Sequence, residues 1–453
     1  MKQAFGKCAE KRLRAEWEQQ AAILLAFPHT RSDWASKIDK ARQCFLDIIE
    51  SIIAFERVLV CIDIHDTQGL AVLCRHFGSD MPPLTPYTTH TLTPQITLAF
   101  VPTNDTWARD FGVITCEIMD SNARDSALGK HSADFGDFEA TADHQSSSAP
   151  KPPKNYESPT ETPRILEEEN QARCEKSAQS LESTFENATN LNEPAKDSRV
   201  FESKAQSPKH KPTQATNLLL DFSFNGWGLK YPSNFDNQIT KSLHKLGTLG
   251  QLPLESSSFI LEGGSIDTDG LGTILTTTAC LLEPNRNATY TKAEIESTLC
   301  QSLGVKRVLW LENGFLQGDD TDSHIDMLAR FLAPDTIAYI SCDDTSDPHY
   351  HALQAMEQEI LAFRQANGRA YKLCRLPFVR AIYDELGERL PASYANFLFV
   401  NGALLVPIYD DPSDTQALAL LQAALPDRAV LGVNARTLIE WHGSLHCVSM
   451  QLY

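Results

Sequence analysis

The sequence predicts an α/β protein, because short apolar strands alternate with amphipathic helices along most of its length. Residues 22–28 (AILLAFP) have the composition of a buried strand. A helical pattern follows over residues 36–56, and residues 57–63 (RVLVCID) again predict a strand. The same rhythm returns near the C-terminus, with strand patterns at 401–409, 429–434 and 444–453 and a helical pattern at 415–425. Periodicity alone does not separate a doubly wound sheet from a propeller of small units.

A hairpin is predicted in the middle of the chain. The segments 259–268 (FILEGGSIDT) and 272–282 (GTILTTTACLL) flank the dipeptide Asp269-Gly270, which favours a tight turn between antiparallel strands.

The composition changes between residues 119 and 216, where Ser, Lys, Glu, Asn and Pro dominate and apolar residues lose any period. Such a segment buries too little surface to offset its ordering entropy, so we expect a disordered or loosely helical insertion. We therefore divide the chain into the first part of a folded domain at 1–118, the insertion at 119–216 and the rest of that domain at 217–453. The flanks DFGVITCEI and NLLLDFSFNGWG predict two strands that meet at a hairpin-like junction.

The formal net charge of -19 argues against nucleic acid or an anionic membrane as the main partner, because both require basic surface. Small cationic molecules fit this charge better. No run of eighteen apolar residues occurs, and the charged N-terminal segment lacks the apolar core of a signal peptide. A cytoplasmic protein is therefore expected.

The eleven cysteines are an odd number and are scattered without CxxC pairs, so neither a disulfide framework nor a zinc site is indicated. In a reduced compartment a cysteine is usually a small buried hydrophobe. Any catalytic assignment of Cys447 must overcome that expectation.

Four polar clusters lie at the ends of predicted elements, where a rigid scaffold commonly places functional loops. They occupy residues 104–110, 262–264, 319–326 and 442–447. The acidic and hydroxyl residues at 321–323 have a simpler interpretation, since each could cap a predicted helix over 324–332 (HIDMLARFL). Capping leaves His324 and Asp326 unexplained.

A nucleophilic cysteine needs a base or a lowered pKa, because a free thiol is mostly protonated at neutral pH. His446 adjoins Cys447, but in an extended segment neighbouring side chains point to opposite faces. The base is therefore expected from a distant segment, and His324, with Asp326 two residues later, is the best candidate. A core or surface role, or metal ligation by the HxD pair, remains an alternative.

Seven segments resemble, in order, the signatures of the family of agmatine deiminases and bacterial peptidylarginine deiminases. The resemblance covers nearly all of the chain outside the insertion. The segments are RAEWEQQAAILLAFPHTRSDW, NDTWARDFG, FNGWGLKYP, LEGGSIDTDGLGTILTTTACLLEPNRN, DDTDSHIDMLARF, SYANFLFVNGALLVPIYDD and GSLHCVSMQ.

The resemblance implies a pentein-type, guanidine-modifying fold, a five-bladed α/β propeller whose catalytic groups meet at the central axis. It places the nucleophile at Cys447 and the acid/base histidine at His324. Asp110 and Asp326 match the two carboxylates that hold the guanidinium, and Glu262 matches the carboxylate of the EGG motif, whose simpler role is to fix the Gly-Gly turn.

Trp107 and Trp227 are expected to line the substrate channel, although large aromatic residues near strand ends are more often simply packed. Asp320 is a candidate partner for a distal ammonium group, with helix capping as its alternative. A thiolate and a histidine supply both the nucleophile and the acid/base group, so no metal and no organic cofactor are expected.

The sequence departs from the family pattern near the nucleophile and near the histidine. His442 and Ser444 stand where most relatives carry glycine and asparagine, and Ser323 replaces the glycine before the histidine. A serine restricts the backbone if a positive φ is required there.

The function expected from the resemblance is hydrolysis of agmatine to N-carbamoylputrescine and ammonia. Deimination of arginine residues in peptides is the first alternative. An inactive scaffold whose insertion binds a protein partner is the second. Family members commonly self-associate, which suggests a homo-oligomer.

Overall fold

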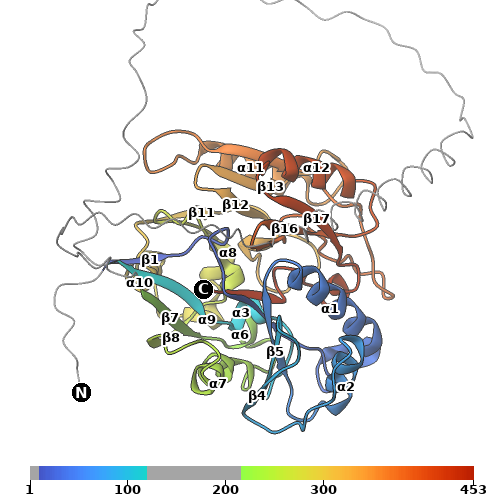
Figure 1. Cartoon of the computed structure of the whole chain (residues 1–453). Coiled ribbons are helices and arrows are strands. Elements are labelled where there is room, and N and C mark those ends of the chain that lie inside the picture. Colours follow the sequence, from blue (N-terminus) through green and yellow to red (C-terminus); the bar gives the residue numbers. More distant parts are fainter. Residues whose placement is uncertain (1–9, 120–215) are drawn as a thin grey trace, which may run out of the picture. The chain divides into compact units, whose positions relative to one another are not determined.

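The computed structural model describes residues 10–119 and 216–453, and these form the folded unit considered below (Figure 1). Nearly all of the predicted insertion lies outside the described residues, so its expected disorder stays a prediction. The two strands that flank it are paired as predicted. β6 (Ile114–Met119) and β7 (Thr216–Ser223) are antiparallel neighbours, with Ile114 opposite Leu220.

The described strands form five separate sheets, and the α/β class predicted from the sequence is confirmed. The first sheet has four strands in the order β1 (Glu10–Leu13), β6, β7 and β8 (Leu254–Ile260). Three sheets have three strands each: β11 (Arg307–Leu311), β10 (Thr273–Thr277) and β9 (Ile266–Thr268); β12 (Ala329–Ala333), β13 (Thr336–Ile340) and β14 (Lys372–Leu376); β15 (Leu398–Val400), β16 (Ala403–Ile408) and β17 (Ala429–Asn434).

The fifth sheet joins the two ends of the described chain. Its order is β18 (Ser449–Leu452), β2 (Ala22–Ala26), β3 (Arg57–Ile62), β5 (Ile96–Phe100) and β4 (Thr88–Thr91). β18 pairs antiparallel with β2, so the last strand of the chain is held beside one of the first. This pairing fixes the position of Cys447, two residues before β18.

One connection pattern recurs in all five sheets: an antiparallel strand pair, then a helix, then a strand parallel to the second member of the pair. The helices are α7 (Ile239–Leu246) before β8, α10 (Lys292–Leu303) before β11, α11 (Tyr350–Ala362) before β14, α12 (Asp414–Ala424) before β17 and α1 (Ile38–Ile53) before β3. In the fifth sheet α2 (Thr67–His76) adds a further parallel strand, β5. Such crossovers bury the strand faces, which explains the apolar runs in the sequence.

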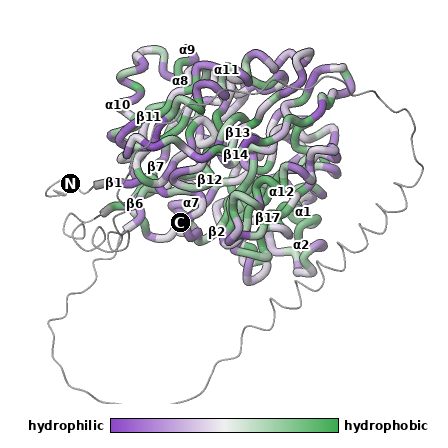
Figure 2. Tube along the Cα trace, turned by 90° about the horizontal axis from the view of Figure 1, so that it is seen from above, coloured by the Kyte–Doolittle hydropathy of each residue, from purple (hydrophilic) through white to green (hydrophobic). Residues whose placement is uncertain are grey.

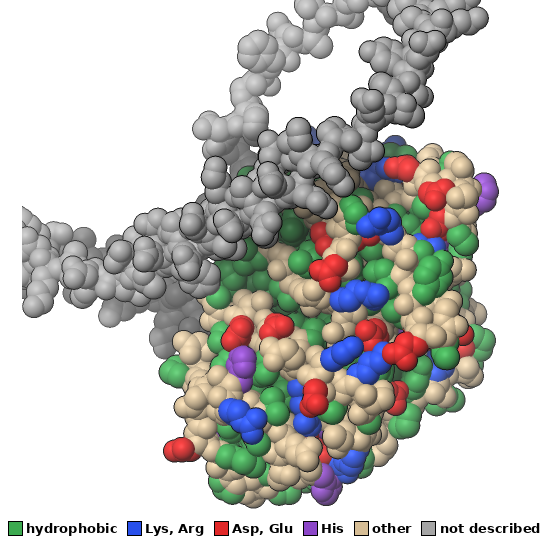
Figure 3. All heavy atoms as spheres, turned by 90° about the vertical axis from the view of Figure 1, so that its right-hand side faces the viewer, with side chains coloured by type: hydrophobic (Ala, Val, Ile, Leu, Met, Phe, Trp, Pro, Cys, Tyr) green, Lys and Arg blue, Asp and Glu red, His purple; other side chains and the backbone are tan. Residues whose placement is uncertain are grey.

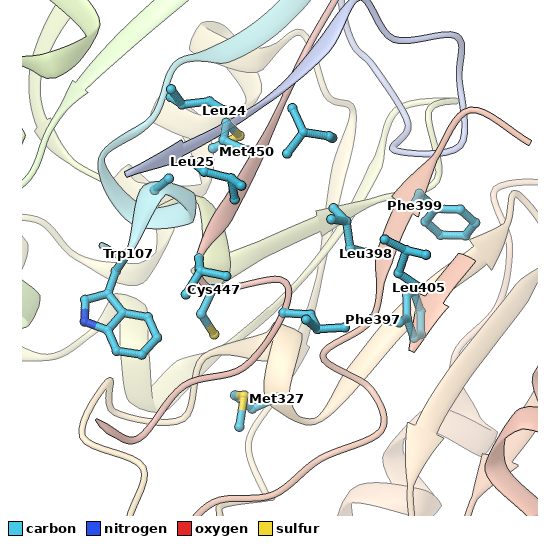
Figure 4. Packing of buried hydrophobic residues seen from close by; sticks show 14 of the residues in the cluster. Leu24, Leu25, Trp107, Met327, Phe397, Leu398, Phe399, Leu405, Cys447 and Met450 are labelled. Atoms are coloured by element: carbon cyan, nitrogen blue, oxygen red, sulfur yellow. The ribbon is translucent and has the colours of Figure 1, made fainter. Parts of the chain in front are cut away.

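Apolar side chains from these sheets pack into one core. Ile23, Leu24 and Leu25 of β2 are fully buried, as are Leu404 and Leu405 of β16. Figure 2 shows hydrophobic and hydrophilic segments alternating along the trace, and Figure 4 shows Leu24, Leu25 and Leu405 within the packing. None of the described helices combines the length and the apolarity that crossing a membrane requires.

The helix predicted over residues 324–332 is wrong. Residues Ile325–Met327 form one 3-10 turn, and β12 begins at Ala329. Four of the five residues of β12 are buried, and a strand buried on both faces has a continuous apolar run that periodicity cannot distinguish from a helix. The 3-10 turn has no side-chain cap, so the capping role considered for residues 321–323 fails with the helix.

Two strand predictions also need correction. Residues 259–268 are not one strand, because β8 ends at Ile260 and β9 begins at Ile266, in a different sheet. Residues 445–448 are a turn rather than an extended segment, and only Ser449–Leu452 are a strand. The hairpin at Asp269-Gly270 is confirmed, with β9 and β10 antiparallel.

Candidate active site

The structure brings together residues from all four polar clusters of the sequence. Asp110 lies on α3 (Ala108–Phe111), Glu262 directly precedes the 3-10 turn Gly263–Ser265, and His324 directly precedes the turn that contains Asp326. Cys447 lies in the turn before β18. All five side chains are at least nine-tenths buried.

The Cys447 sulfur lies 3.7 Å from Asp326 Oδ2 and 3.2 Å from Asn396 Nδ2. The Cys447 carbonyl accepts a hydrogen bond from the Arg109 N–H at 3.1 Å, which ties the turn to α3. Burial, followed by the negative charges of Asp326 and Asp110, raises the pKa of the thiol well above its ordinary value. Figure 4 shows Cys447 beside Trp107, with its sulfur on the side that faces Met327.

Two neutral donors hold the Asp110 carboxylate. Oδ1 accepts from the Gly264 N–H at 3.0 Å, and Oδ2 accepts from Trp227 Nε1 at 2.8 Å. Burial raises the pKa of Asp110 to about 6, against the lowering effect of the charge on His324. Trp227 therefore orients a carboxylate besides lining the cavity, which its sequence context did not indicate.

The His324 ring lies with Nδ1 3.7 Å from Asp110 Oδ1. Neither ring nitrogen has a hydrogen-bond partner among the described residues. Burial opposes the charged ring, but the negative charges of Asp110, Cys280 and Asp326 together raise the pKa of His324 well above its ordinary value. The acidic groups around the ring therefore favour its charged form.

Asp326 is oriented from behind by His446. Its Oδ2 is 2.7 Å from His446 Nδ1, whereas Oδ1 has no partner among the described residues. Burial opposes ionisation, but the hydrogen bond and charge of His446, together with the charges of His324 and Arg330, lower the pKa of Asp326. The carboxylate therefore stays ionised and presents one free oxygen.

The other ring nitrogen of His446, Nε2, is 2.8 Å from Glu16 Oε1. The expectation that His446 and Cys447 point apart along an extended segment is wrong, because the segment turns. His446 is instead occupied at both nitrogens by carboxylates, and this leaves neither nitrogen for proton transfer to Cys447.

Glu262 is paired with Arg286, whose Nε lies 2.9 and 3.0 Å from the two carboxylate oxygens. Ligand atoms of Glu262, Cys280 and His324 lie within 4.8 Å of one another, and carboxylate, thiolate and imidazole are the ligand types that zinc takes. Arg286 already contacts both oxygens of Glu262, so a metal ion there would have to share this carboxylate with a buried guanidinium.

Gly264 is confined by three site residues. A Cβ at this position would lie 2.6 Å from His324 Nδ1, 2.9 Å from Asp110 Oδ1 and 3.0 Å from Asp326 Oδ2. The second glycine of the EGG motif, Gly264, is therefore required because a side chain would not fit there, and not because of its backbone conformation.

A cavity of about 340 Å³ leads to Cys447. None of its described lining residues is lysine or arginine. Five are acidic and three are tryptophan: Asp33, Asp105, Asp110, Asp320, Glu440, Trp107, Trp227 and Trp441. Acidic groups around an aromatic wall suit a cation with an apolar stem.

Asp320 and Trp107, two candidates from the sequence, line this cavity. Asp320 Oδ2 accepts from the Tyr231 hydroxyl at 2.7 Å, and no helix follows it for capping. Trp107 is buried and tilted against Trp34, with ring centroids 5.8 Å apart.

The three departures from the family pattern are all accommodated. Ser323 has a φ of 64° and His442 a φ of 68°, so both adopt the left-handed conformation that favours glycine. His442 Nδ1 donates to the Gly318 carbonyl at 2.6 Å, and the Ser444 hydroxyl is 3.0 Å from that of Tyr409.

Three polar residues of this site were missed from the sequence: Glu16, Arg286 and Asn396. Each lies within a segment that carried the family resemblance, RAEWEQ, EPNRN and SYANF. Nothing in their spacing separates them from ordinary polar residues, because their partners are distant in the sequence.

The site combines a buried thiol that contacts Asp326, an imidazole that faces Asp110, and an acidic cavity that reaches the thiol, an arrangement suited to a cationic ligand. The sequence profile of the Porphyromonas-type peptidyl-arginine deiminase family matches residues 12–151 and 205–452. The chain belongs to this family.

Individual relatives carry two different names. An agmatine deiminase of Pseudomonas fluorescens is 36% identical over 252 residues, which are 51% of this chain and 68% of that protein. A crystal structure provisionally named a peptidyl-arginine deiminase has a TM-score of 0.71 at 39% identity and covers 98% of this chain and 99% of that one. A substrate-bound agmatine deiminase of C. jejuni has a TM-score of 0.69 at 28% identity, covering 99% and 98%.

The confinement of Gly264 gives a direct prediction. Gly264→Ala is expected to lower kcat/KM for a guanidine substrate by at least about 100-fold, since displacements near 1 Å at a catalytic centre cost that much. The matched control is Gly432→Ala, whose new Cβ would meet only side-chain atoms, at 3.0 Å and beyond, away from the site. Equal activity of the two variants would contradict the assignment.

Proposed function

We propose that the protein is an agmatine deiminase, which hydrolyses agmatine to N-carbamoylputrescine and ammonia. One observation carries the proposal: Cys447 and Asp110 line a cavity whose other described walls hold acidic and aromatic side chains and no arginine or lysine. Agmatine has a cationic group at each end of an apolar stem and no carboxylate. The reaction is a step toward putrescine.

The guanidinium is held between Asp110 and Asp326. A planar cation that binds carboxylates through its N–H edges is fixed in orientation as well as in position. Asp326 offers its unpartnered Oδ1, and Asp110 retains lone pairs beyond its bonds to Gly264 and Trp227. Asp326 lies 3.7 Å from the Cys447 sulfur and Asp110 lines the same cavity as Cys447, so binding between the two acids brings the guanidino carbon toward the sulfur.

Substrate binding also activates the nucleophile. The thiol pKa is raised in the free protein by burial and by the two carboxylates. A bound cation neutralises these charges, which lowers the thiol pKa, so the thiol releases its proton to solvent and becomes a thiolate. The thiolate then attacks the guanidino carbon and forms a tetrahedral adduct with a new C–S bond.

His324 moves the protons. As imidazolium it protonates one nitrogen of the adduct, the C–N bond breaks, and ammonia leaves a planar S-alkylthiouronium on Cys447. The neutral ring then takes a proton from water as the oxygen attacks the same carbon. The hydroxyl proton of this adduct is lost to solvent as the C–S bond breaks, the ureido product departs, and the thiolate is regenerated.

Glu262 keeps the histidine charged. Its ligand oxygen lies within 4.8 Å of a His324 nitrogen, and Arg286 fixes the carboxylate in place. The turn also depends on Glu262, whose carbonyl accepts from the Ser265 hydroxyl at 2.6 Å. The chemistry uses a thiolate and a histidine and requires no metal or organic cofactor.

The fold proposal follows the recurring connection pattern. The five sheets are the blades of a five-bladed α/β propeller, with β18 and β2 closing the ring and the site at its centre. The segment 119–216 is an insertion between β6 and β7.

A cytoplasmic location and self-association stay predictions of the sequence. Figure 3 shows basic and acidic side chains interspersed on one face, without the continuous basic surface that nucleic acid requires.

The second candidate is a deiminase of peptidyl arginine, which the name of a structure at 39% identity favours. Such a substrate presents peptide carbonyls, and the cavity offers it no arginine or lysine donor among its described lining residues. An inactive scaffold is disfavoured because all five positions implied by the family motifs are filled and buried together.

The purified protein should be incubated separately with agmatine, free arginine and a capped arginine peptide, with ammonia and ureido product quantified. Turnover of agmatine well above the other two supports the proposal. Preference for the capped peptide supports the second candidate, and no turnover of any substrate supports the inactive scaffold. Cys447→Ser is the matched control and should abolish turnover without changing thermal stability by more than a few degrees.

The charge on Asp320 is predicted to act on the far end of the substrate. Asp320→Asn should raise KM for agmatine about two- to fivefold, the effect of a partly exposed ion pair. Butylguanidine, which has the same guanidinium and stem without the ammonium, should show no change in KM. An equal change in KM for both compounds would show that Asp320 does not act on the ammonium group of the substrate.

The ionisation of Asp110 sets an acid limit. An ordinary aspartate, with a pKa near 3.8, is ionised at about pH 5, whereas burial raises the pKa of Asp110 to about 6. Protonation removes the charge that binds the cation, so kcat/KM for agmatine should fall as pH drops through about 6. A kcat/KM profile that stays flat to about pH 4.5 is the opposing outcome.

A further inference from the structure

We propose that His442 is a specificity-determining residue, which closes one side of the cavity and so excludes guanidines whose stem branches, such as an arginine residue within a peptide. The inference deepens the proposed function and rests on it in one respect, namely that this cavity binds the guanidine substrate. His442 has no role in the proposed chemical steps.

The backbone at His442 has a conformation that a side chain opposes. His442 follows the 3-10 turn Leu438–Trp441 and has a φ of 68° and a ψ of 8°. This left-handed conformation is strained for a residue with a Cβ and unstrained for glycine. Strained residues persist where the surrounding contacts fix them, and they are frequent at ligand sites.

One hydrogen bond of the His442 ring joins two loops of the cavity wall. Nδ1 donates to the Gly318 carbonyl at 2.6 Å, and because a carbonyl only accepts, the proton is on Nδ1. Gly318 lies two residues before Asp320, which lines the cavity as His442 does. The bond therefore closes the gap between the C-terminal loop, which carries Cys447, and the loop that leads to His324.

The neighbouring segments of the cavity wall are also joined in pairs. Trp441 Nε1 donates to the Asp33 carbonyl at 3.0 Å, and the Tyr231 hydroxyl donates to Asp320 Oδ2 at 2.7 Å. These four residues all line the cavity. The His442 bond links the first pair to the second, so the wall is continuous from Asp33 to Tyr231.

A continuous wall restricts the shape of the substrate. The cavity volume of about 340 Å³ is near the lower end of the range of about 300–1,000 Å³ that is usual for ligand sites. Agmatine is one unbranched chain, whereas the main chain of a peptidyl arginine leaves its Cα in two directions. With the proton on Nδ1, Nε2 of the neutral His442 ring is an acceptor, so it offers a peptide carbonyl no hydrogen bond. The ring therefore opposes a peptide by its bulk, without a compensating contact.

The test compares the binding of a branched and an unbranched guanidine. Dissociation constants for a capped arginine peptide and for butylguanidine are measured by calorimetry in the Cys447→Ser background, where neither compound is consumed. His442→Gly removes the ring at a position where glycine is unstrained, so the variant should fold. Its dissociation constant for the peptide should fall at least about tenfold, the effect of a small steric change in a binding pocket. The dissociation constant for butylguanidine should not fall.

His442→Asn is the second variant, because asparagine also tolerates the left-handed conformation and fills part of the opened space. Its dissociation constant for the peptide should lie between those of the parent protein and His442→Gly. The matched control is His244→Asn, which makes the same change on α7, where Nε2 lies 2.9 Å from the Leu252 carbonyl, outside the cavity lining. This control should leave both dissociation constants unchanged.

A dissociation constant for the peptide that is unchanged or higher in His442→Gly would overturn the inference while leaving the proposed function intact. An equal gain in affinity for both compounds would also overturn it, because the cavity would then have loosened for every guanidine. Failure of the wild-type protein to deiminate agmatine would overturn the proposed function and leave the dissociation constants readable.

Discussion

Folding places the carboxylates of Asp110 and Asp326 beside the Cys447 thiol in a buried region, and the rest of the site depends on this concentration of acidic groups. Buried charges are stable only when hydrogen bonds or opposite charges compensate them. Asp110 is held by Trp227 and Gly264, which are neutral donors. The His324 ring, whose Nδ1 lies 3.7 Å from Asp110 Oδ1, compensates part of this negative charge, and in the proposed reaction the guanidinium of the substrate compensates more of it.

Charged residues behind Asp326 form a second layer that supports its carboxylate. Glu16 forms ion pairs with Arg109 at 3.1 Å and with Arg330 at 2.5 Å, and it also contacts His446, which in turn orients Asp326. These residues come from the loop before β2, from α3, from β12 and from the C-terminal turn. The same ion pairs that orient the substrate-facing carboxylate thus join distant parts of the chain, and site geometry and fold are stabilised together.

The sequence predicted what local pattern determines. The strands flanking the insertion, the hairpin at Asp269-Gly270 and the polar cluster that ends at Cys447 are all short-range signals. The sequence could not predict that residues 324–332 form a 3-10 turn followed by a buried strand. Burial on both faces removes the alternation of apolar and polar residues that identifies a strand. The contact of Glu16 with His446 joins residues 430 positions apart and depends on the pairing of β18 with β2. No pattern in the neighbouring sequence indicates such a contact.

In the proposed reaction the Cys447 sulfur forms a covalent bond to the guanidino carbon. This bond can be detected by mass spectrometry of the protein quenched with acid during turnover of agmatine. The peptide containing Cys447 should gain the mass of agmatine less ammonia, whereas Cys447→Ser should gain nothing. Turnover with no adduct on that peptide at any quench time, together with an active Cys447→Ser variant, would contradict it.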